Sequence, residues 1–90
     1  MVTAFVLANV EGSHVADIAD RLRMLEGIAE VHLVAGEYDI LAIVRVADNS
    51  SLSELITREI VHTAGVQRTK TLISMAGYTG QSAAGDGGLA

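Results

Sequence analysis

The 90-residue sequence has no cysteine, no tryptophan and only three aromatic residues, two tyrosines and one phenylalanine. The lack of cysteine excludes disulfide bonds, thiolate metal sites and cysteine nucleophiles, and it favours a reducing compartment. Because half of the residues are nevertheless hydrophobic, we expect Val, Ile, Leu and Ala to build the core. The length is sufficient for one small domain.

Basic residues are also scarce: six Lys and Arg stand against eleven Asp and Glu, for a formal net charge of −5. A phosphate-binding surface needs clustered Lys and Arg, so this balance argues against binding to nucleic acid. No apolar run reaches the roughly 18 residues of a membrane span. The N-terminus has no basic leading region, and its apolar run breaks at residues 9–11, so it is not a signal peptide. We therefore predict a soluble, cytoplasmic protein without membrane contact.

Two apolar runs that flank the polar break Gly36–Asp39 dominate the middle of the chain. Their β-branched residues and the glycine between them predict a β-hairpin over residues 28–35 and 39–47. Both faces of the second strand are apolar, with Ile40, Ala42, Val44 and Val46 on one face and Leu41, Ile43 and Ala47 on the other. A strand of this kind is covered on both sides.

Two further strands are predicted at the ends of the domain, over residues 2–10 and 66–75. The first strand begins almost at Met1, so we expect no domain before it. It places alternate apolar residues on one face (Val2, Ala4, Val6, Ala8 and Val10) and Phe5 and Leu7 on the other.

Helical spacing of apolar residues predicts a helix over residues 14–25, with Ser13 as N-cap and Gly27 at its end. A second helix is predicted to begin with a capping box, in which Ser51 is the N-cap and Glu54 lies at N3. Gly65 ends that helix.

The resulting order, β-α-β followed by β-α-β, predicts an α+β, ferredoxin-like fold: a four-stranded antiparallel sheet with both helices on one face. With Phe5, Leu7 or their alternates on it, the other face would then leave an apolar patch larger than a monomer tolerates. We therefore expect a second copy to cover that face. We predict a domain over residues 1–76 and a flexible tail rich in Gly, Ser and Ala over residues 77–90.

Three features in order resemble the Lrp/AsnC ligand-binding (RAM) domain. They are the Gly-aliphatic helix exit at Gly27, the Gly-x-Tyr-Asp hairpin corner ending at Asp39, and the Gly-Val…Thr-x-Thr strand over residues 65–71. The resemblance implies pairing of sheets as in a dimeric α/β barrel, further assembly into an octamer-like ring, and an amino-acid effector between dimers. Typical members carry an N-terminal helix-turn-helix, which this sequence lacks. It therefore resembles a stand-alone form without direct DNA binding, with full-length regulators as expected partners.

The candidate ligand-binding residues lie at the hairpin corner and on the last strand: Gly36, Glu37, Tyr38, Asp39, Thr69, Thr71, Leu72 and Ile73. Asp39 either accepts a hydrogen bond from an ammonium group or caps its own turn. Thr69 and Thr71 either hold a carboxylate or are ordinary strand residues. Tyr38, Leu72 and Ile73 either line the pocket or pack in the core or an interface.

Nothing in the sequence indicates a catalytic centre, a metal site or a cofactor. His14, His32 and His62 have no metal-ligand spacing. Asp17 and Asp20 fit a solvated helix face, and no nucleophile-base pair or phosphate-binding loop is present. The alternative is a small dimeric α/β-barrel enzyme of the cofactor-free monooxygenase or isomerase type. That function needs a roomy pocket lined by His, Asn or Trp, and the inward positions here are aliphatic.

Overall fold

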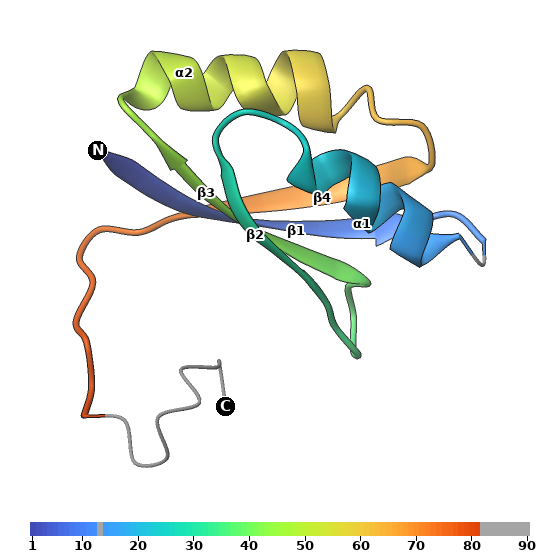
Figure 1. Ribbon diagram of the computed structural model, residues 1–90, viewed down its shortest axis with the longest axis horizontal. Helices are drawn as coiled ribbons and strands as arrows, with labels where there is room; N and C mark the ends of the chain where they lie inside the picture. Colours follow the sequence, from blue (N-terminus) through green and yellow to red (C-terminus); the bar gives the residue numbers. More distant parts are fainter. Residues whose placement is uncertain (13, 82–90) are drawn as a thin grey trace.

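The computed structural model describes residues 1–12 and 14–81. Its elements are β1 (Val2–Val10), α1 (Val15–Arg23), β2 (Ile28–Leu33), β3 (Ile40–Val46), α2 (Asn49–Glu54), a π-helical segment η1 (Leu55–Ile60) and β4 (Val66–Ile73). Figure 1 shows that both helices lie on one face of the sheet. The predicted ferredoxin-like βαββαβ fold is confirmed.

The four strands form one antiparallel sheet in the order β2-β3-β1-β4. The strand β1 is central and pairs with β3 from Val2↔Val46 to Ala8↔Ile40. On its other side it pairs with β4, where the register shifts between Asn9 and Val10. On the β3 side the ladder ends at Ala8, so the end of β1 is left to bond with the hairpin that joins β2 to β3.

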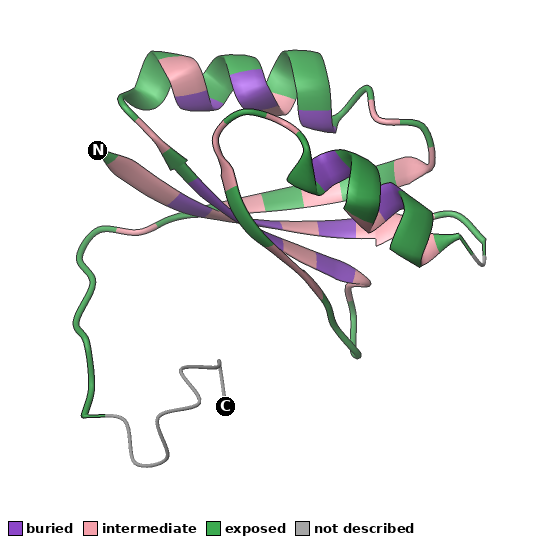
Figure 2. Cartoon of the chain, viewed as in Figure 1, coloured by how far each residue is buried: buried purple, intermediate pink, exposed green. Residues whose placement is uncertain are grey.

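Aliphatic side chains between the sheet and the helices form the core. Figure 2 shows the buried segments at the middle of β1 and β3 and on the inner sides of the helices. The buried core residues are Ala4, Val6, Ala8, Ile18, Leu22, Ile40, Ala42, Val44, Leu52, Leu55 and Ile60. The strand residues among them are those that alternation assigned to one face. The sequence left open which face meets the helices, and the structure shows that it is this one.

Two glycines close the corresponding turns of the two halves, each between a helix and the next strand. Gly27 has φ +99°, and a Cβ there would lie 2.9 Å from Val46 Cγ1. Gly65 has φ +95°, and a Cβ there would lie 2.5 Å from Ile18 Cδ1. Both the positive φ and the close approach therefore require glycine.

The predicted capping box is wrong. The second helix begins three residues earlier, with Asp48 as N-cap, and the Asp48 carboxylate accepts a 2.7 Å hydrogen bond from the backbone N–H of Ser51. This bond lowers the pKa of Asp48. An ionised aspartate is a stronger acceptor than a serine hydroxyl, and Asp48 is the first residue able to cap after β3. The helix continues as η1, where the Val61 N–H donates to the Ile56 carbonyl.

Several predicted boundaries are too long by one or two residues. The structure ends β2 at Leu33, begins β3 at Ile40, ends β4 at Ile73 and confines α1 to Val15–Arg23. In α1 the last turn tightens, since the N–H of Leu25 donates to the carbonyl of Leu22. In the hairpin, the N–H of Val34 donates to the carbonyl of Asp39. This bond lies just beyond Leu33↔Ile40, the last residue pair of the β2–β3 ladder.

The described chain beyond β4 has no helix or strand and runs away from the sheet (Figure 1). Met75 and Tyr78 are almost fully exposed there. Two predictions lie outside the described residues: the N-cap at Ser13 and the part of the tail over residues 82–90. No helix in the described chain is both long enough and apolar enough to cross a membrane.

Candidate ligand-binding site

The hairpin corner between β2 and β3 is an irregular loop over residues 34–39. Gly36 has φ +130°, and no atom lies within 4 Å of the position that a Cβ would take, so the glycine is required by backbone conformation alone. Gly36 and Glu37 are exposed, whereas Tyr38 and Asp39 are half-buried. The corner therefore presents backbone groups to solvent beside two partly covered side chains.

Asp39 connects this corner to the end of β1. Its backbone N–H donates to the Ala8 carbonyl over 3.0 Å. Its carboxylate Oδ2 accepts from the backbone N–H of Val10, also over 3.0 Å. The β1–β3 ladder ends at the pair Ala8↔Ile40, so that N–H has no partner in the ladder. Asp39 thus caps the neighbouring strand rather than its own turn, and its Oδ1 has no hydrogen-bond partner among the described residues.

Asn9 and Arg68 connect the last strand to the same corner, and the sequence did not indicate either of them. The Asn9 side-chain amide donates to the Glu37 carbonyl over 2.7 Å. The Arg68 guanidinium donates to Asn9 Oδ1 over 3.4 Å. The one available signal was Asn9 itself, a polar residue near the end of an apolar strand. The positive charge of Arg68 is therefore held near the corner.

Thr69 and Thr71 lie on the helix side of β4 and are half-buried. Thr69 pairs with Ala8, and Ala8 pairs with Ile40. Two strand spacings, roughly 10 Å, therefore separate Thr69 from the start of β3. Thr71 lies two pairs further along the strand, opposite Val6. Within one chain, Thr69 and Thr71 therefore do not contact the hairpin corner.

Leu72 and Ile73 lie far from the corner. Leu72 pairs with Phe5, and Ile73 pairs with Ala4, so the two side chains point to opposite faces of the sheet. Ile73 is about 13 Å further along β4 than Thr69. Both side chains are about half exposed. The structure thus does not bring the eight predicted residues together in a single chain.

Two hollows on the described chain lie elsewhere. One, of about 580 Å³, lies between α2, η1 and the end of β3 and is lined by Gly27, Val46, Leu55, Arg58 and neighbouring residues. The other, of about 610 Å³, lies between the start of α1 and the start of β4 and is lined by Glu11, His14, Asp17, Arg21, Gly65 and neighbouring residues. Neither hollow contains any of the predicted ligand-binding residues.

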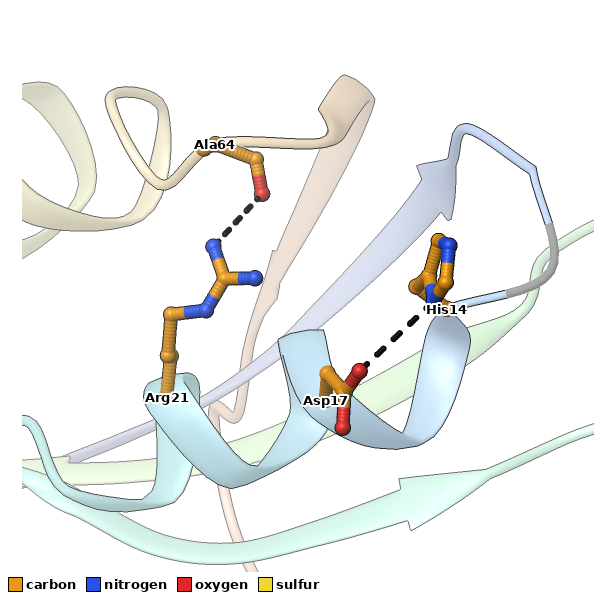
Figure 3. A network of polar contacts seen from close by, with 4 residues as sticks. All are labelled: His14, Asp17, Arg21 and Ala64. Atoms are coloured by element: carbon orange, nitrogen blue, oxygen red, sulfur yellow. Dashed lines mark hydrogen bonds and ion pairs between the residues drawn. The ribbon is translucent and has the colours of Figure 1, made fainter.

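Figure 3 shows the polar contacts beside the second hollow. The Asp17 carboxylate lies 3.6 Å from His14 Nδ1, and both side chains are mostly exposed. The Arg21 guanidinium donates to the Ala64 carbonyl over 3.3 Å and so connects α1 to the turn before β4. These contacts position the helix, and among the described residues no group of three His, Cys, Asp or Glu side chains could hold a metal ion.

Comparison with known proteins gives consistent matches. The family model for the Lrp/AsnC ligand binding domain matches residues 3–82. An HTH-type transcriptional regulator of Pyrococcus furiosus, PF0250, is 35% identical over 75 residues, which cover 80% of this chain and 50% of that protein. The chain thus spans about half the length of the curated relatives it matches.

Two solved structures have the same fold and are more than 30% identical to this chain in sequence. TTHA0845 from Thermus thermophilus has a TM-score of 0.82 at 38% identity, covering 88% of this chain and 99% of that one. The feast or famine regulatory protein Rv3291c from Mycobacterium tuberculosis, solved in complex with L-methionine, has a TM-score of 0.75 at 32% identity. That match covers 89% of this chain and 54% of the regulator.

The hydrogen bond from Val10 to Asp39 predicts that two substitutions of Asp39 differ in their effect on stability. Asp39→Ala removes the acceptor and leaves a partly buried N–H without a partner, so we expect a loss of about 1–2 kcal/mol in the free energy of unfolding. Asp39→Asn keeps an acceptor oxygen and should lose less than half of that. Urea unfolding at one fixed protein concentration measures both. Equal stability of Asp39→Ala and the unmodified chain would show that the bond contributes nothing.

Proposed function

Since this chain belongs to the Lrp/AsnC ligand binding domain family, we propose that it binds an amino acid or a similar small zwitterion and couples this binding to the assembly of several copies. The complex of the 32%-identical Rv3291c with L-methionine supports the ligand class. The match to 99% of the TTHA0845 chain supports the idea that such a domain acts without an attached DNA-binding domain. We propose no catalytic role, since the matched relatives are regulators of transcription. We place its action in the cytoplasm, the compartment predicted from the sequence.

We place the ligand between copies of the chain, with the Gly36–Asp39 corner of one copy facing β4 of another. The observation that carries this choice is the separation of the predicted residues within one chain: Leu72 and Ile73 lie far from Asp39 along the sheet. The free Oδ1 of Asp39 is suited to an ammonium group, and the hydroxyls of Thr69 and Thr71 are suited to a carboxylate. Tyr38, Leu72 and Ile73 would contact the apolar part of the ligand.

A ligand held by two copies necessarily couples binding to assembly. It has more contacts in the assembled state than on a single chain, so it shifts the population toward that state. Assembly in turn raises the affinity for the ligand by the same factor. An octamer-like ring of dimers would repeat this arrangement at every contact between dimers.

Titration calorimetry with L-methionine, followed by the other amino acids, tests the ligand proposal. We expect Asp39→Asn to bind roughly tenfold to a hundredfold more weakly, because a charge-assisted hydrogen bond contributes about 1.5–3 kcal/mol. Asp48→Asn is the matched control, since it makes the same chemical change at an exposed helix cap. Unchanged affinity of Asp39→Asn would contradict the placement of the ammonium group. Absence of binding heat from every amino acid would leave assembly alone as the proposed role.

We further propose that these 90 residues do not read DNA themselves and act through co-assembly with a full-length regulator of the family. The net charge of −5 opposes contact with phosphate. The pure protein should therefore shift no operator fragment in a gel at physiological salt. A sequence-specific shift that persists in added salt would contradict this part of the proposal.

The sheet face opposite the helices supports the proposed assembly. Register and alternation place five apolar side chains on this face: Phe5, Leu7, Leu41 and Ile43 on the two inner strands and Leu72 on the edge strand β4. No element of the described chain covers this face (Figure 1). We propose that a second copy covers it, because a contiguous apolar surface of this kind is typical of an interface.

Leu7→Asp tests this surface, since it would place a carboxylate at the centre of the interface without a partner. Burial of an unpaired charge costs several kcal/mol, so the dissociation constant of the dimer should rise at least a hundredfold. Met24→Asp, at a mostly exposed position at the end of α1, is the control and should not change it. Sedimentation equilibrium measures both variants, and circular dichroism checks that they fold. A dimer that tolerates Leu7→Asp would contradict the proposed interface.

A further inference from the structure

Under the proposed function each chain contributes to two different ligand sites, because the corner of one copy faces β4 of another. The chain provides its Gly36–Asp39 corner to one site and Thr69 and Thr71 of β4 to a second site. The strands that carry these two parts have only β1 between them, in the order β3-β1-β4. Figure 1 shows the end of β1 between the hairpin and the start of β4. Residues at that end of β1 are therefore placed to connect the two sites.

Asn9 is the residue of β1 whose side chain contacts both parts. Its Nδ2 donates to the Glu37 carbonyl of the corner over 2.7 Å. Its Oδ1 accepts from the Arg68 guanidinium of β4 over 3.4 Å. A carbonyl needs a donor and a guanidinium needs an acceptor, so the two partners fix the orientation of the amide. An ionised aspartate of the same shape could accept from Arg68 but could not donate to Glu37.

Three consecutive residues of β1 hold the corner. The Ala8 carbonyl accepts from the Asp39 N–H, and the Val10 N–H donates to the Asp39 carboxylate. Both bonds use backbone groups of β1 and fix the end of the corner. Within residues 1–12 and 14–81, the bond from the Asn9 side chain is the one hydrogen bond that holds Glu37. The position of the exposed part of the corner thus depends on Asn9.

The contact between Asn9 and β4 lies beside an irregularity in the sheet. Asn9 pairs with Arg68 and Val10 pairs with Val66, so Gln67 has no partner residue on β1. A bulge of this kind bends its strand and changes the direction of nearby side chains. At 3.4 Å the bond from Arg68 is close to the longest distance of a hydrogen bond, so a small shift of either group forms or breaks it. The contact therefore has two states.

On the basis of the function proposed above, we propose that Asn9 couples the two ligand sites to which one chain contributes. A ligand that holds the corner also holds the Glu37 carbonyl and the Asn9 amide, and Asn9 then keeps Arg68 in contact. This contact fixes the bulged part of β4, from which Thr69 follows directly. The β4 part of the second site is then ordered before its ligand arrives, so the second ligand binds more tightly than the first. Asn9 is a positioning residue and does not touch the ligand.

Equilibrium dialysis with radiolabelled L-methionine measures this coupling as a Hill coefficient. The protein concentration is chosen so that light scattering gives the same assembly with and without the ligand, which removes the contribution of assembly itself. We expect a Hill coefficient above 1 for the unmodified chain. Arg68→Met breaks one bond of Asn9 and leaves the corner anchored. The Hill coefficient should therefore fall to 1, while the mean affinity changes by less than about twofold.

Asn9→Asp separates the two bonds of Asn9, because it keeps the acceptor for Arg68 and removes the donor to Glu37. It should lower the Hill coefficient to 1 and also weaken binding roughly threefold to tenfold, since the hydrogen bond that holds the corner is lost. In the double variant Asn9→Asp/Arg68→Met, the second substitution should not change the Hill coefficient further, as expected for two bonds in series.

Lys70→Met is the matched control for Arg68→Met. Lys70 is an exposed residue of the same strand and loses the same charge, but it pairs with Leu7 and not with Asn9. Lys70→Met should therefore keep the Hill coefficient of the unmodified chain. Circular dichroism checks that all variants fold.

The outcomes distinguish the coupling from ligand binding itself. If the unmodified chain binds neither L-methionine nor any other amino acid, the proposed function fails and the coupling fails with it. If the unmodified chain binds with a Hill coefficient of 1, the ligand proposal stands and the coupling is overturned. The coupling is equally overturned if Arg68→Met and Asn9→Asp keep the Hill coefficient of the unmodified chain, or if Lys70→Met lowers it as much as they do.

Discussion

The structure depends on one constraint. The central strands β1 and β3 carry apolar side chains on both faces of the sheet, and the two helices cover only one of these faces. Ala4, Val6 and Ala8 are buried on the helix side of β1, and Phe5 and Leu7 alternate with them on the open side. Helices placed on both faces would require a different chain order, since both β-α-β units are right-handed and share one sheet. We propose that a second copy covers the open apolar face, which links the fold of one chain to the proposed assembly.

The fold could be predicted because its determinants are local. Alternation identified both faces of β1 and β3, and glycines at positions 27 and 65 marked the exits from the helices. The errors arose where two local signals competed. Asp48 and Ser51 are both suitable N-caps, and only the backbone geometry shows that Asp48 accepts the bond from Ser51. The π-helical geometry of η1 left no pattern in the sequence.

The candidate site could be predicted only in part, because its contacts join distant segments. The Gly36–Asp39 corner was recognisable from residue types. The role of Asp39 as an acceptor for Val10 depends on where the β1–β3 ladder ends, which the sequence did not reveal. The contacts of Asn9 with Glu37 and Arg68 depend on strand order in the same way. Leu72 and Ile73 were grouped with Thr69 by sequence, but the register separates them along the strand and assigns them to opposite faces.

Native mass spectrometry of the unmodified chain, with and without an added amino acid, tests the central claim most directly, because it reports assembly and bound ligand together. The account predicts species with an even number of 9.4 kDa chains. It also predicts bound amino acid only on species larger than the dimer, whose proportion rises as the amino acid is added. A folded single chain that carries bound amino acid would contradict the account, because it would place a complete site within one copy.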